Sequence, residues 1–196
     1  MNKKHLKNQL SALSLSMFRK DFFGIYHGSL SAKTDTNRFI INTKEAVFDN
    51  IDEKNLIELS FKKDYRWKQA SIDANIHHSI YSNISQAKFI CFSMPQFTTA
   101  YSLEHNMIIP KDYFGYKEIG FVEIVDPKQF EDWYDRAQSE IILYFQTKKT
   151  NLMVIRGYGV YAYSRDIHEM AKKLAILEKS CRLLMLGSST TLCDYD

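Results

Sequence analysis

The last third of the chain carries the pattern that most restricts the fold. Leu152–Ile155 and Val160–Tyr163 are short apolar runs on either side of Gly157-Tyr158-Gly159, which is typical of two strands around a tight turn. Apolar side chains then recur at helical spacing, at Ile167, Met170, Leu174, Leu177, Cys181 and Leu184. Strands that lead directly into a long amphipathic helix indicate an α/β fold.

Capping residues mark the ends of this helix. Ser164 or Asp166 can cap its start, and Glu169 stands three residues after Asp166 as a capping-box partner. Gly187 is expected to stop it. A second helical face is predicted by isoleucines four residues apart, at Ile72, Ile76, Ile80 and Ile84.

The remaining elements follow from shorter patterns. Helices are expected up to Asp21, from Pro95 and from Pro127, and a helical turn at 52–55. The expected strands are Phe23–Tyr26, Arg38–Asn42, Leu56–Phe61, Lys88–Phe92 and Phe121–Val125, with a turn at Lys33–Asn37. With only three prolines and seven glycines and no linker, the chain is predicted to be one domain over residues 1–196.

Composition excludes several classes of protein. The 196 residues are 45% hydrophobic, and 26 basic against 23 acidic side chains leave a net charge of +3, which does not predict nucleic-acid binding. No run approaches the roughly 20 apolar residues that cross a bilayer, so no membrane partner is expected. Cys91, Cys181 and Cys193 lack metal-type spacing and are odd in number, which favours a reduced, cytoplasmic setting.

Four segments, in order, carry a resemblance that runs from about Leu10 to Leu186. They are Gly28-Ser29-Leu30-Ser31 with Phe39-Ile40-Ile41-Asn42; Ala70-Ser71-Ile72-Asp73 with His77 and Ile80-Tyr81; Phe92-Ser93-Met94-Pro95 with Thr98-Thr99-Ala100; and Ile155-Arg156-Gly157-Tyr158-Gly159-Val160. They resemble the Gly-Asn-Ile-Ser, Pro-Ser-Ser-Glu, His-Thr-His-Pro and Arg-Gly-His-Gly-Val segments of the class II aldolase/adducin family. The resemblance implies a three-layer α/β/α fold with a central mixed, largely antiparallel sheet.

Members of that family use three histidines to hold zinc, which stabilises the enediolate formed from a sugar phosphate. In this sequence the three positions hold Phe92, Met94 and Tyr158. Asp73 stands at the position of the family's glutamate base and is one methylene shorter. The resemblance therefore predicts the fold without the family's zinc site, and no cofactor is expected.

Other parts of the implied site are altered or retained. Thr43-Lys44-Glu45 replaces a Pro-Ser-Gly segment that approaches phosphate, although Lys44 can attract an anion. Gly28, Ser29, Ser71 and His77 remain as candidate ligand-binding residues. Phe92, Met94 and Tyr158 would form an apolar floor, with Asp73 and Tyr158 as the candidate catalytic groups.

Two functions remain open from the sequence. The first is a catalytically degenerate protein that binds a small phosphorylated ligand or a protein partner, as adducin's head domain serves interaction. The second is a sugar-phosphate aldolase or epimerase with a rebuilt site, in which His27, His77 or Tyr158 assists Asp73. In that case zinc or another divalent metal would be held by His27, Asp73 and His77. The resemblance also implies a homo-oligomer, with a tetramer as the family's common form.

Overall fold

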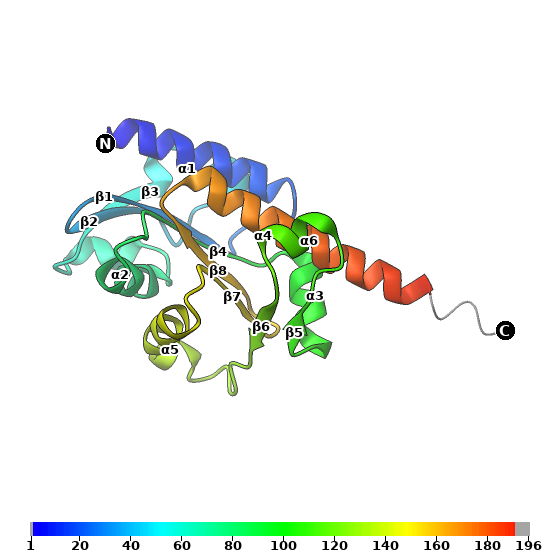
Figure 1. The fold of residues 1–196 in the computed structure, drawn as a ribbon. Helices are drawn as coiled ribbons and strands as arrows, with labels where there is room; N and C mark the ends of the chain where they lie inside the picture. The colour runs from blue at the N-terminus through cyan, green and yellow to red at the C-terminus, as the bar shows by residue number, and fades with distance from the viewer. Residues whose placement is uncertain (1, 191–196) are drawn as a thin grey trace.

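The computed structural model describes residues 2–190 and is built around one eight-stranded sheet (Figure 1). The strand order is β3-β2-β1-β4-β8-β7-β6-β5. Neighbouring strands are antiparallel except β6 and β7, which are parallel. The strands are β1 (Ser29–Asp35), β2 (Arg38–Asn42), β3 (Leu56–Ser60), β4 (Phe89–Ser93), β5 (Met107–Ile108), β6 (Val122–Val125), β7 (Leu152–Ile155) and β8 (Gly159–Ser164).

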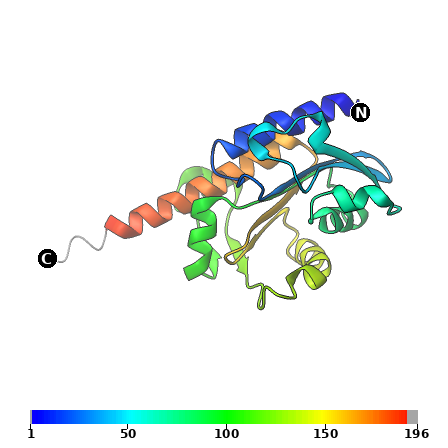
Figure 2. The same ribbon diagram turned by 180° about the vertical axis from the view of Figure 1, so that it is seen from behind.

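Helices cover both faces of the sheet, which confirms the expected three layers. Figure 1 shows α1 and α6 on one face and α2 and α5 on the other, and Figure 2 shows the same arrangement from behind. Within residues 2–190, no helix combines the length and apolar character that a membrane span requires. The helices are α1 (Lys3–Phe18), α2 (Ala74–Asn83), α3 (Gln96–Glu104), α4 (Tyr113–Glu118), α5 (Trp133–Lys148) and α6 (Ile167–Thr190).

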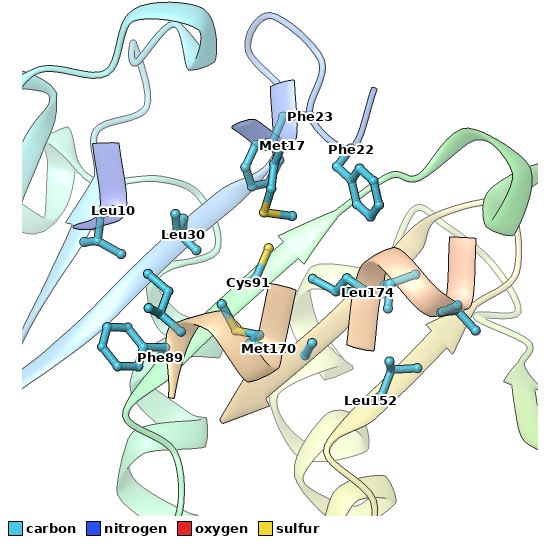
Figure 3. Close-up of a cluster of buried hydrophobic side chains, with 14 of the residues drawn as sticks. Leu10, Met17, Phe22, Phe23, Leu30, Phe89, Cys91, Leu152, Met170 and Leu174 are labelled. Carbon is cyan, nitrogen blue, oxygen red and sulfur yellow. The ribbon is translucent and has the colours of Figure 1, made fainter. Parts of the chain in front are cut away.

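One apolar core lies between the sheet and helices α1 and α6 (Figure 3). Leu10 and Met17 come from α1, Met170 and Leu174 come from α6, and Cys91 projects from β4 toward them. Burial raises the pKa of the Cys91 thiol, so the side chain acts as a small apolar group in this core. The capping box predicted for α6 is present in part, since Asp166 accepts hydrogen bonds from the backbone of His168 and Glu169.

A second core lies between the sheet and helices α2 and α5. Ile76 and Ile80 from α2 and Ile141 from α5 pack with Tyr161 of β8 and Trp133 at the start of α5. Two of the four expected isoleucines, Ile76 and Ile80, lie within α2, and Ile84 is its C-cap. Ile72 precedes the helix and is 66% exposed. On this side of the sheet the ionisable side chains of Asp73 and His77 are buried as well.

The expected strand at Phe23–Tyr26 was wrong. Phe23 is buried against Phe48, with ring centroids 4.4 Å apart, but the backbone there forms a loop closed by the Gly24 amide and the His27 carbonyl. The first strand is β1, which also takes in most of the expected turn at Lys33–Asn37. Ser29 and Ser31 of β1 are fully buried, and the contacts of the site explain why they are there.

Three helix ends also differ from expectation. The helix expected from Pro127 begins at Trp133, because Lys128 has a left-handed φ of 59° that interrupts helical hydrogen bonding. Asp21 has a φ of 60° and lies beyond α1, which ends at Phe18. Gly187 does not stop α6, which continues to Thr190. The short elements β5 and α4 had no sequence signal.

Candidate functional site

A pocket of about 230 Å³ opens on the sheet beside the start of α2. It is formed by the loop before β1, the end of β2, the segment before α2, the end of β4, helix α5 and the β7–β8 turn. The residues that line it are Tyr26, His27, Gly28, Asn42, Lys44, Ser71, Ile72, Asp73, Phe92, Met94, Tyr134, Gly157 and Tyr158.

Most of the predicted site residues meet in this pocket. Gly28, Lys44, Ser71, Asp73, Phe92, Met94, Tyr158 and His27 all line it. Ser29 and His77 lie behind the lining and are fully buried. Tyr134 and Asn42 also line the pocket, although neither was among the predicted site residues.

The floor of the pocket is aromatic. The Phe92 ring lies 4.9 Å from Tyr158 and 4.7 Å from Tyr161, measured between ring centroids. The Tyr158 hydroxyl donates a hydrogen bond of 2.7 Å to the Tyr134 hydroxyl on α5. Burial, followed by the nearby charge of Asp73, raises the pKa of Tyr158, so the phenol stays protonated at neutral pH.

A glycine in the β7–β8 turn brings Tyr158 to this floor. Gly159 has a φ of +144°, and a Cβ there would lie 2.5 Å from the Ser93 carbonyl oxygen. Only glycine allows this close approach of the turn to the end of β4. The same approach places Tyr158 against Phe92.

Asp73 is the acidic group of the pocket. It stands at the N-cap of α2 but makes no side-chain cap bond. Its side chain turns inward, where the Tyr161 hydroxyl donates a hydrogen bond of 2.9 Å to Oδ1 and only 2% of the residue is exposed. Burial raises the pKa of Asp73 to about 6, although hydrogen bonds from Ser29 and Tyr161 oppose the rise.

His77 lies directly behind Asp73 and uses both ring nitrogens. Its Nε2 is 2.8 Å from the Ser29 hydroxyl, and its Nδ1 is 2.7 Å from the Ser31 hydroxyl. The Ser31 hydroxyl is also 2.8 Å from the hydroxyl of Tyr81. Burial lowers the pKa of His77 to about 3, so the imidazole is neutral and carries one N–H.

In this chain of hydrogen bonds, each group donates toward Asp73. An ionised Asp73 accepts hydrogen bonds only, so Ser29 donates to it and accepts from the Nε2–H of His77. The Nδ1 atom then accepts from Ser31, which accepts from Tyr81, whose hydroxyl also lies 3.4 Å from the Lys88 carbonyl oxygen. We assign these donor roles from the network. The serines of β1 are therefore part of a buried polar relay that ends on the carboxylate.

The residues at the three metal positions implied by the resemblance do not fit zinc. Phe92 offers no donor atom, Met94 offers a neutral thioether, and Tyr158 keeps its phenolic proton. The other candidate set is not brought together, because His77 is engaged with two serines while His27 is exposed at the pocket. Across residues 2–190 there is no cluster of three or more His, Cys, Asp or Glu side chains suited to a metal.

Comparison with known proteins identifies a family whose model matches most of the chain. Residues 8–185 match the family described as class II aldolase and adducin N-terminal domain. No match was found among curated protein sequences.

Solved structures share the fold at low sequence identity. L-fuculose-1-phosphate aldolase from Thermus thermophilus is 16% identical, with a TM-score of 0.87 over 99% of this chain and 100% of that one. YgbL from Klebsiella pneumoniae is 18% identical, with a TM-score of 0.81 over 100% and 93% of the two chains. A sugar-phosphate aldolase from Thermotoga maritima is 11% identical, with a TM-score of 0.69 over 94% and 97%.

Proposed function

The chain belongs to the class II aldolase and adducin N-terminal domain family, and from this premise we propose that it binds a small ligand in the Asp73–Tyr158 pocket without zinc-dependent aldol chemistry. The observation that carries the proposal is the replacement of the three implied zinc ligands by Phe92, Met94 and Tyr158, which now form the pocket floor. Zinc-dependent aldol chemistry requires a bound metal ion as the electrophile for the developing charge, and these side chains do not fit one.

Metal content tests this proposal. We expect the purified, untagged protein to contain far less than one zinc per chain, even when zinc is supplied during expression. The matched variant Phe92→His/Met94→His/Tyr158→His restores three imidazoles in the same backbone frame and is expected to take up about one zinc per chain. About one transition ion per wild-type chain would overturn the proposal, while uptake by the triple variant alone would support it.

A metal-free acid–base enzyme is the second candidate. The raised pKa of Asp73, about 6, is suited to a general base at neutral pH, and the protonated Tyr158 could act as an acid. Two structural neighbours are sugar-phosphate aldolases, so a sugar phosphate is the substrate class to try, with Lys44 at the pocket to attract its phosphate. Turnover by metal-free protein would favour this candidate over a binding role.

We also propose that the chain forms a homo-oligomer, and a tetramer is the form that the resemblance implies. Large apolar side chains are exposed along the stretch of chain that runs from β5 through α4 to β6, at Met107, Ile109, Tyr113, Phe114, Tyr116 and Phe121. The exposed rings of Tyr113 and Phe114 lie 5.4 Å apart on α4. Such a patch is typical of a protein–protein interface.

Light scattering after size-exclusion chromatography checks the oligomer. We expect wild-type protein to have a mass of several chains and the Tyr113→Glu/Phe114→Glu variant to shift toward one chain, because two charges would be buried in the interface. Leu143→Glu, which changes an exposed apolar residue on α5, is the control and should leave the mass unchanged. A monomeric wild-type protein would contradict this proposal.

A further inference from the structure

We propose that the ligand of this pocket is a small organic cation whose ammonium group lies beside Asp73, among the aromatic rings at the family's metal position. The inference rests on the proposed ligand-binding function and names its ligand class. Two features carry it: a buried carboxylate that has no cationic partner within residues 2–190, and an aromatic lining around it.

The carboxylate of Asp73 lacks a counter-charge in the described part of the chain. Among residues 2–190, no ion pair includes it, although it is 2% exposed. Its hydrogen bonds come from neutral hydroxyls, those of Tyr161 and Ser29. A buried charge without a partner is unfavourable, so a cation bound beside it gains strongly in electrostatic free energy.

The lining around Asp73 also favours a cation. Phe92, Tyr134, Tyr158 and Tyr26 all line the pocket, and the first three are connected by a ring contact and a hydroxyl–hydroxyl bond. The negative faces of aromatic rings attract ammonium groups, most strongly where water is excluded. Aromatic rings would not hold a hydrated metal ion, whereas an alkylated ammonium group matches both the rings and the carboxylate.

The size and charge of the pocket restrict the range of possible ligands further. A volume of about 230 Å³ lies below the range of about 300–1,000 Å³ usual for drug-sized ligands, so the site suits a compact head group. Lys44 and His27 are exposed at the pocket and are the basic residues among the described side chains that line it. They disfavour a second positive charge and favour a hydroxyl or an anion at the other end of the ligand.

Calorimetric titration of the wild-type protein tests the inference with defined probes. Choline, tetramethylammonium and ethanolamine supply the ammonium group, and 3,3-dimethyl-1-butanol is the neutral isostere of choline. We expect at least one cation to bind, and choline to bind at least about tenfold more tightly than its isostere. Asp73→Asn, which keeps the shape but removes the charge, should greatly reduce that preference, and Tyr158→Leu should weaken cation binding. Asp49→Asn, an exposed acid outside the pocket, should leave binding unchanged.

The outcomes separate this inference from the function on which it rests. Equal binding of choline and the isostere would overturn the cation while leaving a ligand pocket. Failure of all three cations at millimolar concentration would also overturn it. If that failure were accompanied by about one bound zinc per chain, the proposed function would fall as well. A preference for cations that is undiminished in Asp73→Asn would overturn the role given to the charge of Asp73.

Discussion

Replacing Asp73 by asparagine is expected to stabilise the protein at pH 7.5 by about 3 kcal/mol, because a buried charge is removed while the shape of the side chain is kept. The pKa of Asp73 is raised from 3.8 to about 6 in the folded state, so folding favours the protonated form. That contribution is complete below about pH 3.8 and is lost as the pH rises through about 6. Asparagine can still accept the hydrogen bond of Tyr161 and has no proton to lose.

Urea unfolding of both proteins at pH 7.5 and pH 4.5 measures this effect. The variant should be more stable at pH 7.5, and its advantage should shrink at pH 4.5, where the folded wild-type protein has taken up the proton. Asp49→Asn is the control, because Asp49 is exposed. A variant no more stable than wild type at pH 7.5 would contradict the unpaired-charge description of the site. Stability gained at the cost of ligand selectivity would be the trade-off expected of a binding residue.

Replacing His77 by alanine is expected to lower the free energy of unfolding by about 3–5 kcal/mol. The imidazole is fully buried and joins Ser29 to Ser31, so its removal leaves a cavity and two hydroxyls without their partner. His78→Ala is a matched control on the same helix. The His78 ring is only partly buried and packs edge-on against Phe61, with centroids 4.6 Å apart, so its loss should cost much less.

The pH dependence of His77→Ala provides an independent check. The pKa of His77 is lowered from 6.5 to about 3 on folding, so its contribution is present above pH 6.5 and is lost as the pH falls toward 3. Stability curves over this range should converge for wild type and His77→Ala as the pH falls. Equal losses for His77→Ala and His78→Ala, or parallel curves, would show that the serine bridge contributes little.

Many helices and strands could be predicted because their signals are local, whereas the three-layer arrangement was implied by the resemblance. Spacing within α6 and the turn at Gly157–Gly159 identify elements without knowledge of their partners. Strand β1 was not predicted, and its polar residues Ser29 and Ser31 are bound by His77, which is 48 and 46 residues away. A polar strand residue that is satisfied by a distant helix has no short-range signature.

The site was predicted only in part, again because partners distant in the sequence decide where its side chains lie. Asp73 stands at a helix start, where its side chain would ordinarily cap the helix. It instead meets Tyr161, 88 residues away, and becomes a buried acid. Tyr134 lies next to the buried Trp133 on α5, and nothing in the helical spacing shows that it reaches the hydroxyl of Tyr158. These partners depend on how the helices cross the sheet.

The strand order has a consequence for synthesis of the chain. Strands β7 and β8 lie between β4 and β6 in the sheet, although they follow both in the sequence. The described sheet thus has two parts, the strands β1 to β4 and the pair of β5 and β6. The strands β7 and β8, within Leu152–Ser164, join these two parts. On the ribosome, the first half of the chain must expose the edge of β4 until these strands emerge, and an exposed edge invites pairing with other chains. The sheet can therefore be completed only late in the synthesis of each chain, after β7 and β8 have left the ribosome.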